Sequence, residues 1–578
     1  MSRPVSPRES NGRRPRKIVV VGGVAGGMSV AARARRLDEH AEILVFERGG
    51  DVSFSNCSLP FHLSGIIPDA RSLVLMTPPA FAAQYNIDAR TRHEVIRINR
   101  AEKTVTVTDL VAAEQFDEPY DTLFLSPGAV PVLPPIPGVD SEHVFTVRNV
   151  EDIDRIQRCV SQKVVTDVVV VGGGYVGLEV AENLRMAGKQ VTVIEMQDQV
   201  LMRLDSDIVQ LIHRELHDQG INLVLSDALT EIGPDKVMVA SGASYAAQAV
   251  VMAIGVRPET SLAAACGLTL GTTRAIKVDG HYRTNDPDIY AVGDAIEVFN
   301  QLTHKPSRLA MAGPAQRQAR AAADHLSGQS TRQTGVIGSA VVRVFDQTAA
   351  STGLTENECR AENMSFERVY VIGADKVGLM PDSQAMHLKL LFEVPTGRVL
   401  GAQAVGPGNV EKRIDVIATL IMMGGTIEDM RDLELCYSPW YSTAKDVVNN
   451  AALVALNILN KVYRQITVGD LRRIIEDDDA MIIDAREENE FARGHIKGAV
   501  NIPLSQFRNR LDEIPTDRPV YCHCRIGQRS YNMVRALNQL GFPNAINIGG
   551  SFLGFCNHEY FHDQVSGRES LVTGYNFR

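Results

Sequence analysis

The sequence lacks any run of about 18 apolar residues, the length that a membrane-spanning helix needs. It also has one tryptophan and only eight cysteines in 578 residues. Cysteines this sparse exclude a disulfide-dense secreted scaffold and indicate reduced thiols. The first sixteen residues, MSRPVSPRESNGRRPR, contain no apolar segment of the kind found in secretory signals. We therefore expect a cytoplasmic protein with a disordered tail at residues 1–16.

The sequence also has fewer basic than acidic residues. The formal net charge is −10, with 22% charged and 44% hydrophobic residues, which is typical of a soluble protein. This composition favours neither a nucleic-acid nor a membrane partner, and no residue spacing indicates a metal site. The length predicts roughly four domains, at about 150 residues each.

Two glycine-rich segments each follow a short apolar strand and precede a helix. The first, GGVAGG, has Gly22 and Gly27 at the outer positions of a G-x-G-x-x-G pattern, with Val24 in the middle, and Glu47 ends the next strand. An unrelated tight turn could have a similar sequence, but the preceding strand, the following helix and the acidic residue favour a nucleotide-binding site.

The second segment, GGGYVG, is complete, with Gly172, Gly174 and Gly177, and Glu195 ends the strand that follows. A carboxylate there accepts hydrogen bonds from a ribose 2′-hydroxyl and repels a 2′-phosphate, so we expect NADH, with NADPH still possible. Glu195 could also be a solvated strand end. Two such segments in one chain indicate a flavin-dependent enzyme that takes hydride from a nicotinamide.

The segment IYAVGDA places Asp294 after a strand, and here the chain resembles the pyridine nucleotide-disulfide oxidoreductase family. The resemblance implies that Asp294 contacts bound FAD. Many members carry two cysteines in a C-x4-C spacing, whereas SFSNCSLPFHLSG has Cys57 alone and resembles the single-cysteine branch. Cys57 would then be the redox thiol, although a lone cysteine is more often inert. The other cofactor-contacting positions that we expect are Val24, Ala25, Arg48, Asn56, Tyr175 and Gly255.

The segment CYSPWYSTAKD is similar to the dimerisation segment of coenzyme A disulfide reductases. The similarity implies a homodimer in which Tyr437 completes the active site of the opposite subunit, although a packed aromatic would look the same. Those enzymes commonly carry Tyr-Tyr-Pro where this chain has Leu379-Met380-Pro381. The difference weakens the case for a strict coenzyme A disulfide substrate, and coenzyme A stays a possible ligand.

The C-terminal part resembles rhodanese domains in MIIDAREENEFARGHIKGAVNIP and VYCHCRIGQRS. Cys524 would carry sulfane sulfur and Arg529 would close its loop, while Cys522 is either a resolving thiol or a plain strand residue. Backbone N–H groups of so short a loop can stabilise an anionic sulfur. The remaining cysteines show no accompanying chemistry, and we expect them to be buried: Cys159, Cys266, Cys359, Cys436 and Cys556.

The expected fold class is α/β, with two Rossmann-like dinucleotide-binding domains of the glutathione reductase type, an α+β dimerisation domain and a C-terminal α/β rhodanese-like domain. The FAD-binding domain is expected to be discontinuous because the NAD(P)H-binding domain interrupts it. The expected bounds are 17–150 with 270–330 for FAD, 151–269 for NAD(P)H, 335–460 for dimerisation, 466–560 for the rhodanese-like domain and 561–578 for a C-terminal tail.

The resemblance implies that NAD(P)H reduces a persulfide, polysulfide or coenzyme A-type disulfide through FAD and Cys57, with sulfane sulfur held by Cys524. The partners would be small sulfur compounds and a second copy of the chain. One alternative is an NADH oxidase or peroxidase in which Cys57 cycles through a sulfenic acid. Another is a sulfur-relay or redox-sensing protein.

Overall fold

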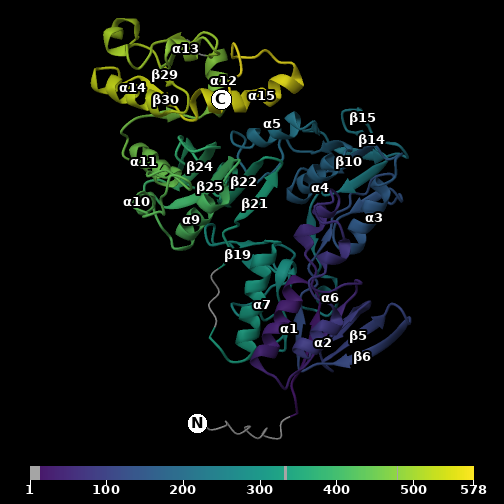
Figure 1. Cartoon of the computed structure of the whole chain (residues 1–578). Coiled ribbons are helices and arrows are strands. Elements are labelled where there is room, and N and C mark those ends of the chain that lie inside the picture. The colour runs from purple at the N-terminus through teal and green to yellow at the C-terminus, as the bar shows by residue number, and fades with distance from the viewer. Residues whose placement is uncertain (1–13, 331–334, 478–479, 578) are drawn as a thin grey trace. The chain divides into compact units, whose positions relative to one another are not determined.

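The computed structural model describes residues 14–330, 335–477 and 480–577, and all elements named below lie within them. The predicted disorder of residues 1–13 lies outside these ranges, but Arg14 forms an ion pair with Asp121 at 2.9 Å. The chain, drawn in Figure 1, divides into two compact units. The first comprises residues 14–134, 145–163 and 254–330 with 335–336, and the second holds the rest.

The first unit is built on a parallel sheet of order β18-β7-β1-β2-β3. Its strands are runs of Val, Ile, Leu and Phe that are buried on both faces, as a parallel sheet between helices requires. The strands are β1 Lys17–Val21, β2 Glu42–Glu47, β3 Asp88–Thr91, β7 Thr122–Leu125 and β18 Ile289–Ala291.

Helices and small antiparallel sheets surround this sheet. The helices, including the 3-10 helices η1 to η3, are α1 Ala25–Leu37, η1 Asn56–His62, η2 Ala70–Leu73, α2 Pro78–Tyr85, α3 Val150–Val160, α6 Ser261–Ala265, η3 Gly293–Ala295 and α7 Ala312–Leu326. The additional strands are β4 His93–Asn99, β5 Thr104–Asp109, β6 Glu114–Pro119, β8 Ala129–Pro131, β17 Val256–Pro258, β19 Val298–Phe299 and β20 Pro306–Ser307.

The second unit starts with another Rossmann-like sheet, of order β12-β11-β10-β16-β9. Its strands are β10 Asp167–Val171, β11 Gln190–Ile194, β12 Asn222–Val224, β16 Ala249–Met252 and β9 Val144–Thr146, of which only Val144 belongs to this unit. The helices α4 Tyr175–Met186 and α5 Gln210–Asp218 and a small sheet accompany it, the latter made of β13 Leu229–Ile232, β14 Lys236–Val239 and β15 Ser244–Ala246.

An antiparallel sheet of order β21-β22-β25-β24-β23 follows in the same unit. Its strands are β21 Ala340–Val344, β22 Gln347–Gly353, β23 Phe366–Ala374, β24 Ala385–Glu393 and β25 Val399–Gly406. The helices of this part are α8 Glu356–Ala361, α9 Val410–Met422, α10 Ile427–Arg431 and α11 Val447–Leu459. On β24, Lys389 is buried and pairs with Asp205, Asp207 and Glu356, which ties this sheet to the loop before α5.

The C-terminal part is a parallel sheet of order β26-β30-β29-β27-β28. Its strands are β26 Gln465–Ile466, β27 Met481–Asp484, β28 Val500–Asn501, β29 Val520–His523 and β30 Ala545–Ile548. Its helices are α12 Val468–Asp477, α13 Glu488–Phe491, η4 Phe507–Asn509, η5 Leu511–Glu513, α14 Gln528–Gln539 and α15 Ser551–Ser566. Tyr370 and Ile372 of β23 belong to its hydrophobic core.

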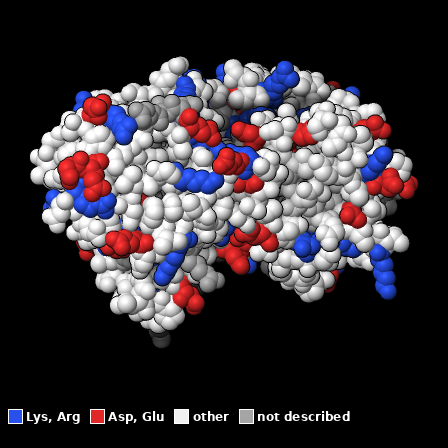
Figure 2. All heavy atoms as spheres, turned by 90° about the horizontal axis from the view of Figure 1, so that it is seen from above, with Lys and Arg blue, Asp and Glu red and all other residues white. Residues whose placement is uncertain are grey.

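These sheets confirm the predicted fold class, with parallel sheets before and after an α+β region. The predicted domain bounds stay predictions, because a compact unit can hold several domains; α15 runs past residue 560, where the tail was expected to start. None of the described helices combines the length and apolar character that crossing a membrane requires. On the face shown in Figure 2, acidic and basic side chains are interspersed.

Candidate functional site

The first glycine loop joins β1 to α1 through a backbone that excludes side chains at two positions. Gly22 has φ of 100°, and a Cβ on Gly27 would lie 1.8 Å from the Gly22 carbonyl oxygen. Val24 has φ of −114° and ψ of −135°, outside the main helical and extended regions, but its negative φ does not require glycine at the middle position. No side chain caps α1, and Ala25 begins it without an acidic first turn. Its N–H groups therefore suit an anionic phosphate.

Glu47 ends β2 in a fixed orientation. Its carboxylate accepts hydrogen bonds from the N–H groups of Gly23 and Gly49, both at 2.7 Å. Arg48 lies 3.7 Å from Glu94, and burial together with the charge of Arg48 lowers the pKa of Arg148. An anion would stabilise the two neighbouring guanidiniums of Arg48, after β2, and Arg148, before α3.

Asp294 lies in η3 after β18, in the same unit as the first glycine loop. Burial raises the pKa of its carboxyl group, and among the described residues it has no hydrogen-bond partner. A partly buried carboxyl group without an internal partner can accept a hydrogen bond from a ligand hydroxyl. The preceding Gly293 donates its N–H to Gln318 at 2.8 Å, which holds the loop in place.

Cys57 lies in η1, directly after a segment that is bonded to the first glycine loop. The Ser53 N–H donates to the Gly23 carbonyl oxygen at 2.8 Å. Leu59 and Pro60 of η1 are buried, whereas Asn56 and Cys57 are exposed. The apolar pair thus anchors η1 and presents the thiol at the surface of its unit.

The second glycine loop, between β10 and α4, repeats the geometry of the first. Gly172 has φ of 109°, and a Cβ on Gly177 would lie 2.0 Å from the Gly172 carbonyl oxygen. Gly174 caps α4, with no atom within 4 Å of its Cβ position. Glu195 accepts from the N–H groups of Gly173 at 2.8 Å and Gln197 at 2.9 Å. The loop therefore has an open helix N-terminus and a fixed carboxylate.

Tyr175 and Gly255, two further residues predicted to contact a cofactor, lie at the start of α4 and after β16. Tyr175 is the first residue of α4, and burial raises the pKa of its hydroxyl group. Gly255 follows β16 with φ of 116°, and its carbonyl oxygen accepts from the Val132 N–H at 3.0 Å. Gly255 belongs to the first unit and Tyr175 to the second.

Tyr437 lies in an exposed aromatic segment of the second unit. It is 51% exposed, beside Trp440 and Tyr441, which are 58% and 65% exposed. The Val377 N–H donates to the Pro439 carbonyl oxygen at 3.3 Å, and the nearby Leu379 is 88% exposed. Apolar side chains that gather on a surface indicate a protein interface. The predicted role of Tyr437 in an opposite subunit stays a prediction.

Cys524 lies between β29 and α14 and is only 1% exposed. Its Sγ accepts a hydrogen bond from the Gly527 N–H at 3.2 Å and lies 3.7 Å from the Ser530 hydroxyl. The Cys524 N–H donates to Ser551 at 3.3 Å, and the Phe552 N–H donates to the Cys524 carbonyl oxygen at 3.0 Å. The N-termini of α14 and α15 therefore meet at this residue, which favours an anionic sulfur.

Arg529 closes the loop through two hydrogen bonds to Glu490, at 2.5 and 2.7 Å. Glu490 and Cys524 raise the pKa of Arg529, so the guanidinium stays charged beside the sulfur.

Burial alone would raise the pKa of Asp484, but His523 and Arg486 outweigh the effect of burial and hold the pKa of Asp484 below its ordinary value. His495 stacks on Phe491 at 3.7 Å. Arg486 and Asp484 form a buried ion pair at 2.6 Å.

Comparison with known proteins identifies this arrangement. The model of the pyridine nucleotide-disulphide oxidoreductases matches residues 16–319. The chain belongs to this family. The family's dimerisation domain matches residues 339–447, and a rhodanese-like domain matches residues 467–558. Family membership makes the protein an oxidoreductase and implies binding of FAD and a pyridine nucleotide.

Similar proteins cover three quarters or more of the chain. The chain is 35% identical to coenzyme A disulfide reductase of Staphylococcus epidermidis over 75% of this chain and 98% of that protein. The structure of reduced Bacillus anthracis CoADR-RHD is 40% identical, with a TM-score of 0.91, over 95% of this chain and 99% of that chain. An NAD-dependent persulfide reductase from A. fulgidus is 35% identical, with a TM-score of 0.89, over 93% and 99%. The resemblance inferred from the motifs is confirmed.

The residues of the first unit fit FAD. The steric exclusion at Gly22 and Gly27, the anchored Glu47 carboxylate and the unpartnered Asp294 carboxyl suit a diphosphate, a ribose and a polyol, respectively. When bound, FAD supplies a two-electron carrier between a nicotinamide and a thiol.

The cysteines differ from the expectation at one position. Cys359 and Cys556 are buried, Cys159 and Cys266 are partly buried, but Cys436 is exposed, so the expected burial was wrong for Cys436. Its place in the exposed segment with Tyr437 explains this. Cys522 is fully buried in a hydrophobic core, and burial raises the pKa of its thiol to about 12. A protonated, inaccessible thiol supports a structural role for Cys522.

Sequence reasoning missed Glu179, one turn into α4. Burial, with a smaller effect of Glu182, raises the pKa of Glu179 to about 7. The available signal was a carboxylate between the apolar residues Leu178 and Val180 of this helix.

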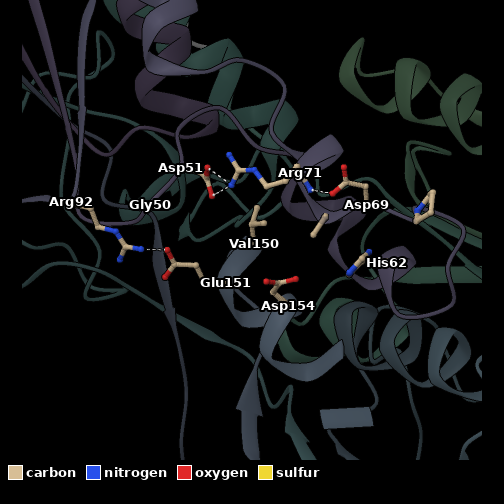
Figure 3. Close-up of a pocket in the computed structure, with 11 residues that line it drawn as sticks. Gly50, Asp51, His62, Asp69, Arg71, Arg92, Val150, Glu151 and Asp154 are labelled. Carbon is tan, nitrogen blue, oxygen red and sulfur yellow. Dashed lines mark hydrogen bonds and ion pairs between the residues drawn. The ribbon is translucent and has the colours of Figure 1, made fainter. Parts of the chain in front are cut away.

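A cavity of about 520 Å³ in the first unit is the other notable feature near η1 (Figure 3). His62 of η1 lines the cavity. The two arginines in the lining already form ion pairs, Arg71 with Asp51 at 3.0 Å and Arg92 with Glu151. Asp69 and Asp154 add further carboxylates to the lining. The cavity is acidic and so does not suit a polyphosphate.

Proposed function

We propose that this protein uses NADH to reduce a persulfide or polysulfide at Cys57, and that Cys524 holds the sulfane sulfur. The observation that carries the proposal is the hydrogen bond from Ser53 to Gly23, which fixes the segment of the only cysteine in η1 against the first glycine loop. Disulfides of the coenzyme A type are a further substrate class that Cys57 would reduce.

Each chain residue has a defined task in this reaction. Gly22 and Gly27 admit the diphosphate of FAD, and Glu47 orients the adenosine ribose. Glu195 accepts bonds from the nicotinamide dinucleotide's ribose and disfavours a 2′-phosphate, so NADH is preferred. The Cys57 thiolate attacks the sulfur of the substrate, and sulfide or a thiol leaves with the bonding electron pair.

Cys524 is suited to a persulfide anion because the Gly527 N–H points at its sulfur and Arg529 stays charged beside it. Carrying both thiols on one chain raises the effective concentration of the second thiol. The matched dimerisation domain and the exposed segment around Tyr437 support a homodimer.

Steady-state NADH oxidation under anaerobic conditions tests the proposal. The substrates are polysulfide, coenzyme A persulfide, coenzyme A disulfide and hydrogen peroxide, with oxygen added in a separate series. We expect turnover with sulfur compounds and its loss in Cys57→Ser, while the matched control Cys159→Ser keeps the activity of the parent protein.

Peroxide or oxygen turnover that is faster than sulfur turnover would instead support the oxidase or peroxidase alternative. Negligible NADH turnover with every substrate, combined with sulfur transfer from Cys524 to another protein, would support the sulfur-relay alternative.

A further inference from the structure

Arg413 of α9 is a buried arginine whose guanidinium bonds two surface loops at once. Only 2% of Arg413 is exposed, and it donates to the carbonyl oxygens of Asp375 at 3.0 Å and Tyr441 at 3.3 Å. Asp446 balances the charge and accepts at 2.9 Å, and Asn409 offers a further carbonyl oxygen at 3.2 Å. A guanidinium can serve this many acceptors because it presents five donors in a planar fork.

The first loop, residues 375–384, joins β23 to β24. It closes on itself, since the Asp375 N–H donates to the Gln384 carbonyl oxygen at 3.0 Å and the Gln384 N–H donates to the Asp375 carboxylate at 2.8 Å. The Val377 N–H donates to the Pro439 carbonyl oxygen at 3.3 Å, which joins this loop to the second one. The buried guanidinium therefore holds the base of the first loop.

The second loop joins α10 to α11 and carries Tyr437. Its central part is a compact turn, in which the N–H groups of Tyr441 and Ser442 donate to the Ser438 carbonyl oxygen at 2.9 and 3.1 Å. The Ser442 hydroxyl, on a residue that is 1% exposed, donates to the Cys436 carbonyl oxygen at 3.0 Å. The turn that contains Tyr437 is thus closed, and the guanidinium holds its far end through the Tyr441 carbonyl oxygen.

Asp446 ties the same guanidinium to the start of α11. Its carboxylate caps this helix by accepting from the Val448 N–H at 3.1 Å, and Asp446 is 5% exposed. A buried, hydrogen-bonded charge pair has little freedom to rearrange, because separating its members would leave a charge in the interior without a partner. The pair of Arg413 and Asp446 is therefore a fixed point from which both loops are held.

The side chain of Tyr437 contrasts with this buried support. Tyr437 is 51% exposed, although the turn around it is bonded from the buried side. Surface loops are usually mobile, and a misplacement of about 1 Å in a reacting group can reduce a rate about 100-fold. The bonds of Arg413 restrict the movement of the turn and so fix the point from which the Tyr437 side chain extends.

We propose that Arg413 positions Tyr437 for sulfur reduction by holding the two loops as one surface. Arg413 is enclosed and touches no substrate, so it acts through Tyr437 as a positioning residue. The inference rests on the proposed homodimer, in which Tyr437 would complete the active site of the opposite subunit.

Arg413→Lys tests the positioning role in the full-length protein loaded with FAD. Lysine keeps a cation beside Asp446 but lacks the planar fork that reaches both loop carbonyl groups. We expect kcat for NADH-dependent reduction of polysulfide to fall about tenfold, with the KM for NADH within about twofold of the parent value. Stopped-flow reduction of FAD by NADH should keep its rate, because that half-reaction does not use Tyr437.

Tyr437→Phe, alone and combined with Arg413→Lys, shows whether the arginine acts through the tyrosine. Tyr437→Phe should lower kcat for polysulfide at least tenfold, and adding Arg413→Lys should lower it by less than a further factor of about two. A further tenfold loss in the double variant, or slower reduction of FAD by NADH in Arg413→Lys, would overturn the inference.

A second variant covers the case in which Arg413→Lys does not fold. Arg413→Met combined with Asp446→Asn removes both charges together, so no buried charge is left without a partner. Asparagine also preserves the cap of α11, because it is a favoured N-cap residue. This double variant should show the same loss of kcat, and a kcat equal to that of the parent protein would overturn the inference.

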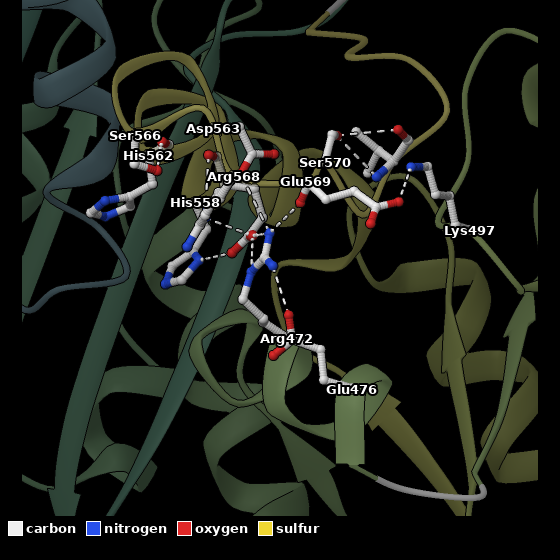
Figure 4. Close-up of polar contacts among 12 residues, drawn as sticks. Arg472, Glu476, Lys497, His558, His562, Asp563, Ser566, Arg568, Glu569 and Ser570 are labelled. Carbon is white, nitrogen blue, oxygen red and sulfur yellow. Dashed lines mark hydrogen bonds and ion pairs between the residues drawn. The ribbon is translucent and has the colours of Figure 1, made fainter.

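Arg472→Lys is the matched control, because it makes the same exchange at an arginine in the C-terminal part (Figure 4). Arg472 of α12 pairs with Glu559 at 2.5 Å and Asp563 at 3.3 Å, both of which are buried. Asp563 also accepts from Tyr575, in the C-terminal segment of residues 570–577. The control should unfold at a lower temperature and keep kcat within about twofold. An equal loss of kcat in both variants would show that lost stability explains the effect and would overturn the inference.

The remaining outcomes separate this inference from the proposed function. If Cys57→Ser keeps the polysulfide turnover of the unaltered protein, the proposed reaction at Cys57 fails. If Tyr437→Phe keeps full turnover, the role of Tyr437 and this inference fail together, while the reaction at Cys57 stands. If Tyr437→Phe is slow and Arg413→Lys has the kcat of the unaltered protein, only this inference fails.

Discussion

The two candidate sulfur sites present their thiols in opposite ways. Cys57 is exposed on a 3-10 helix that is anchored by buried Leu59 and Pro60. Cys524 is 1% exposed, and its sulfur accepts a backbone hydrogen bond at a helix N-terminus. An exposed thiol can meet a large substrate, whereas an enclosed one can hold a reactive anion without losing it. The difference predicts that a substitution at one thiol site reduces the activity of that site and leaves the activity of the other site unchanged.

The largest expected effect comes from the backbone of the enclosed site. Gly527→Ala should reduce sulfur transfer from thiosulfate to cyanide about 100-fold, because φ of 106° disfavours alanine and moves the N–H that bonds Cys524. NADH-dependent reduction of polysulfide at Cys57 should be unchanged.

Gly541→Ala is the matched control for that variant. Gly541 has φ of 98° in the same domain, with no atom within 4 Å of its Cβ position. Equal loss of sulfur transfer in both variants would mean that backbone strain alone, and not the bond to Cys524, explains the effect.

Glu490→Gln should reduce the same sulfur transfer about tenfold, because the two hydrogen bonds that orient Arg529 lose their charge. Glu490→Asp should recover part of the activity. Kinetics with thiosulfate measure both variants, and an unchanged rate in Glu490→Gln would show that the loop holds Arg529 without its carboxylate.

Glu195→Ala should change the nucleotide preference of the reductase and leave sulfur transfer at Cys524 unchanged. The ratio of kcat/KM for NADH to that for NADPH should fall about tenfold, because the repulsion of a 2′-phosphate is lost. Thiosulfate:cyanide activity is the internal control. A ratio that stays constant would exclude Glu195 as the determinant of nucleotide preference.

Acid should destabilise the second unit. Burial lowers the pKa of both His213 and His387 to about 3, so both stay neutral in the folded protein while the unfolded chain binds protons below its ordinary pKa of 6.5. Stability should therefore fall as the pH decreases from 6.5 towards 3, by at most about 1.4 kcal/mol per pH unit for each histidine.

Thermal unfolding between pH 5 and pH 7.5 measures this dependence. His213→Asn should flatten the curve, although the Val200 N–H that donates to His213 at 3.2 Å needs the amide as a substitute acceptor. The same slope in the variant would contradict the assignment to His213.

The smallest effect is expected at Cys522. Cys522→Ala should change sulfur transfer by less than about twofold, because its buried thiol has a pKa of about 12 and cannot act as a resolving thiolate. Detection of a Cys522–Cys524 disulfide by mass spectrometry after turnover would contradict this.

Local patterns made the fold class and the main motifs predictable from the sequence. The glycine loops could be recognised because the positive φ angles of Gly22 and Gly172 favour glycine. Val24 has a negative φ, which does not require glycine. The contacts of residues 570–577 could not be predicted, since Arg214 and Phe577 are distant in sequence and carry no joint signal. The raised pKa of Glu179 likewise depends on burial created by the fold.

The central claim is that electrons from NADH reach sulfur compounds through Cys57. Anaerobic stopped-flow absorbance tests it most directly: protein loaded with FAD is reduced by one equivalent of NADH and mixed with polysulfide. The account predicts rapid reoxidation in the unaltered protein and in Cys524→Ser, and its loss in Cys57→Ser. Reoxidation of Cys57→Ser at the rate of the unaltered protein would contradict it.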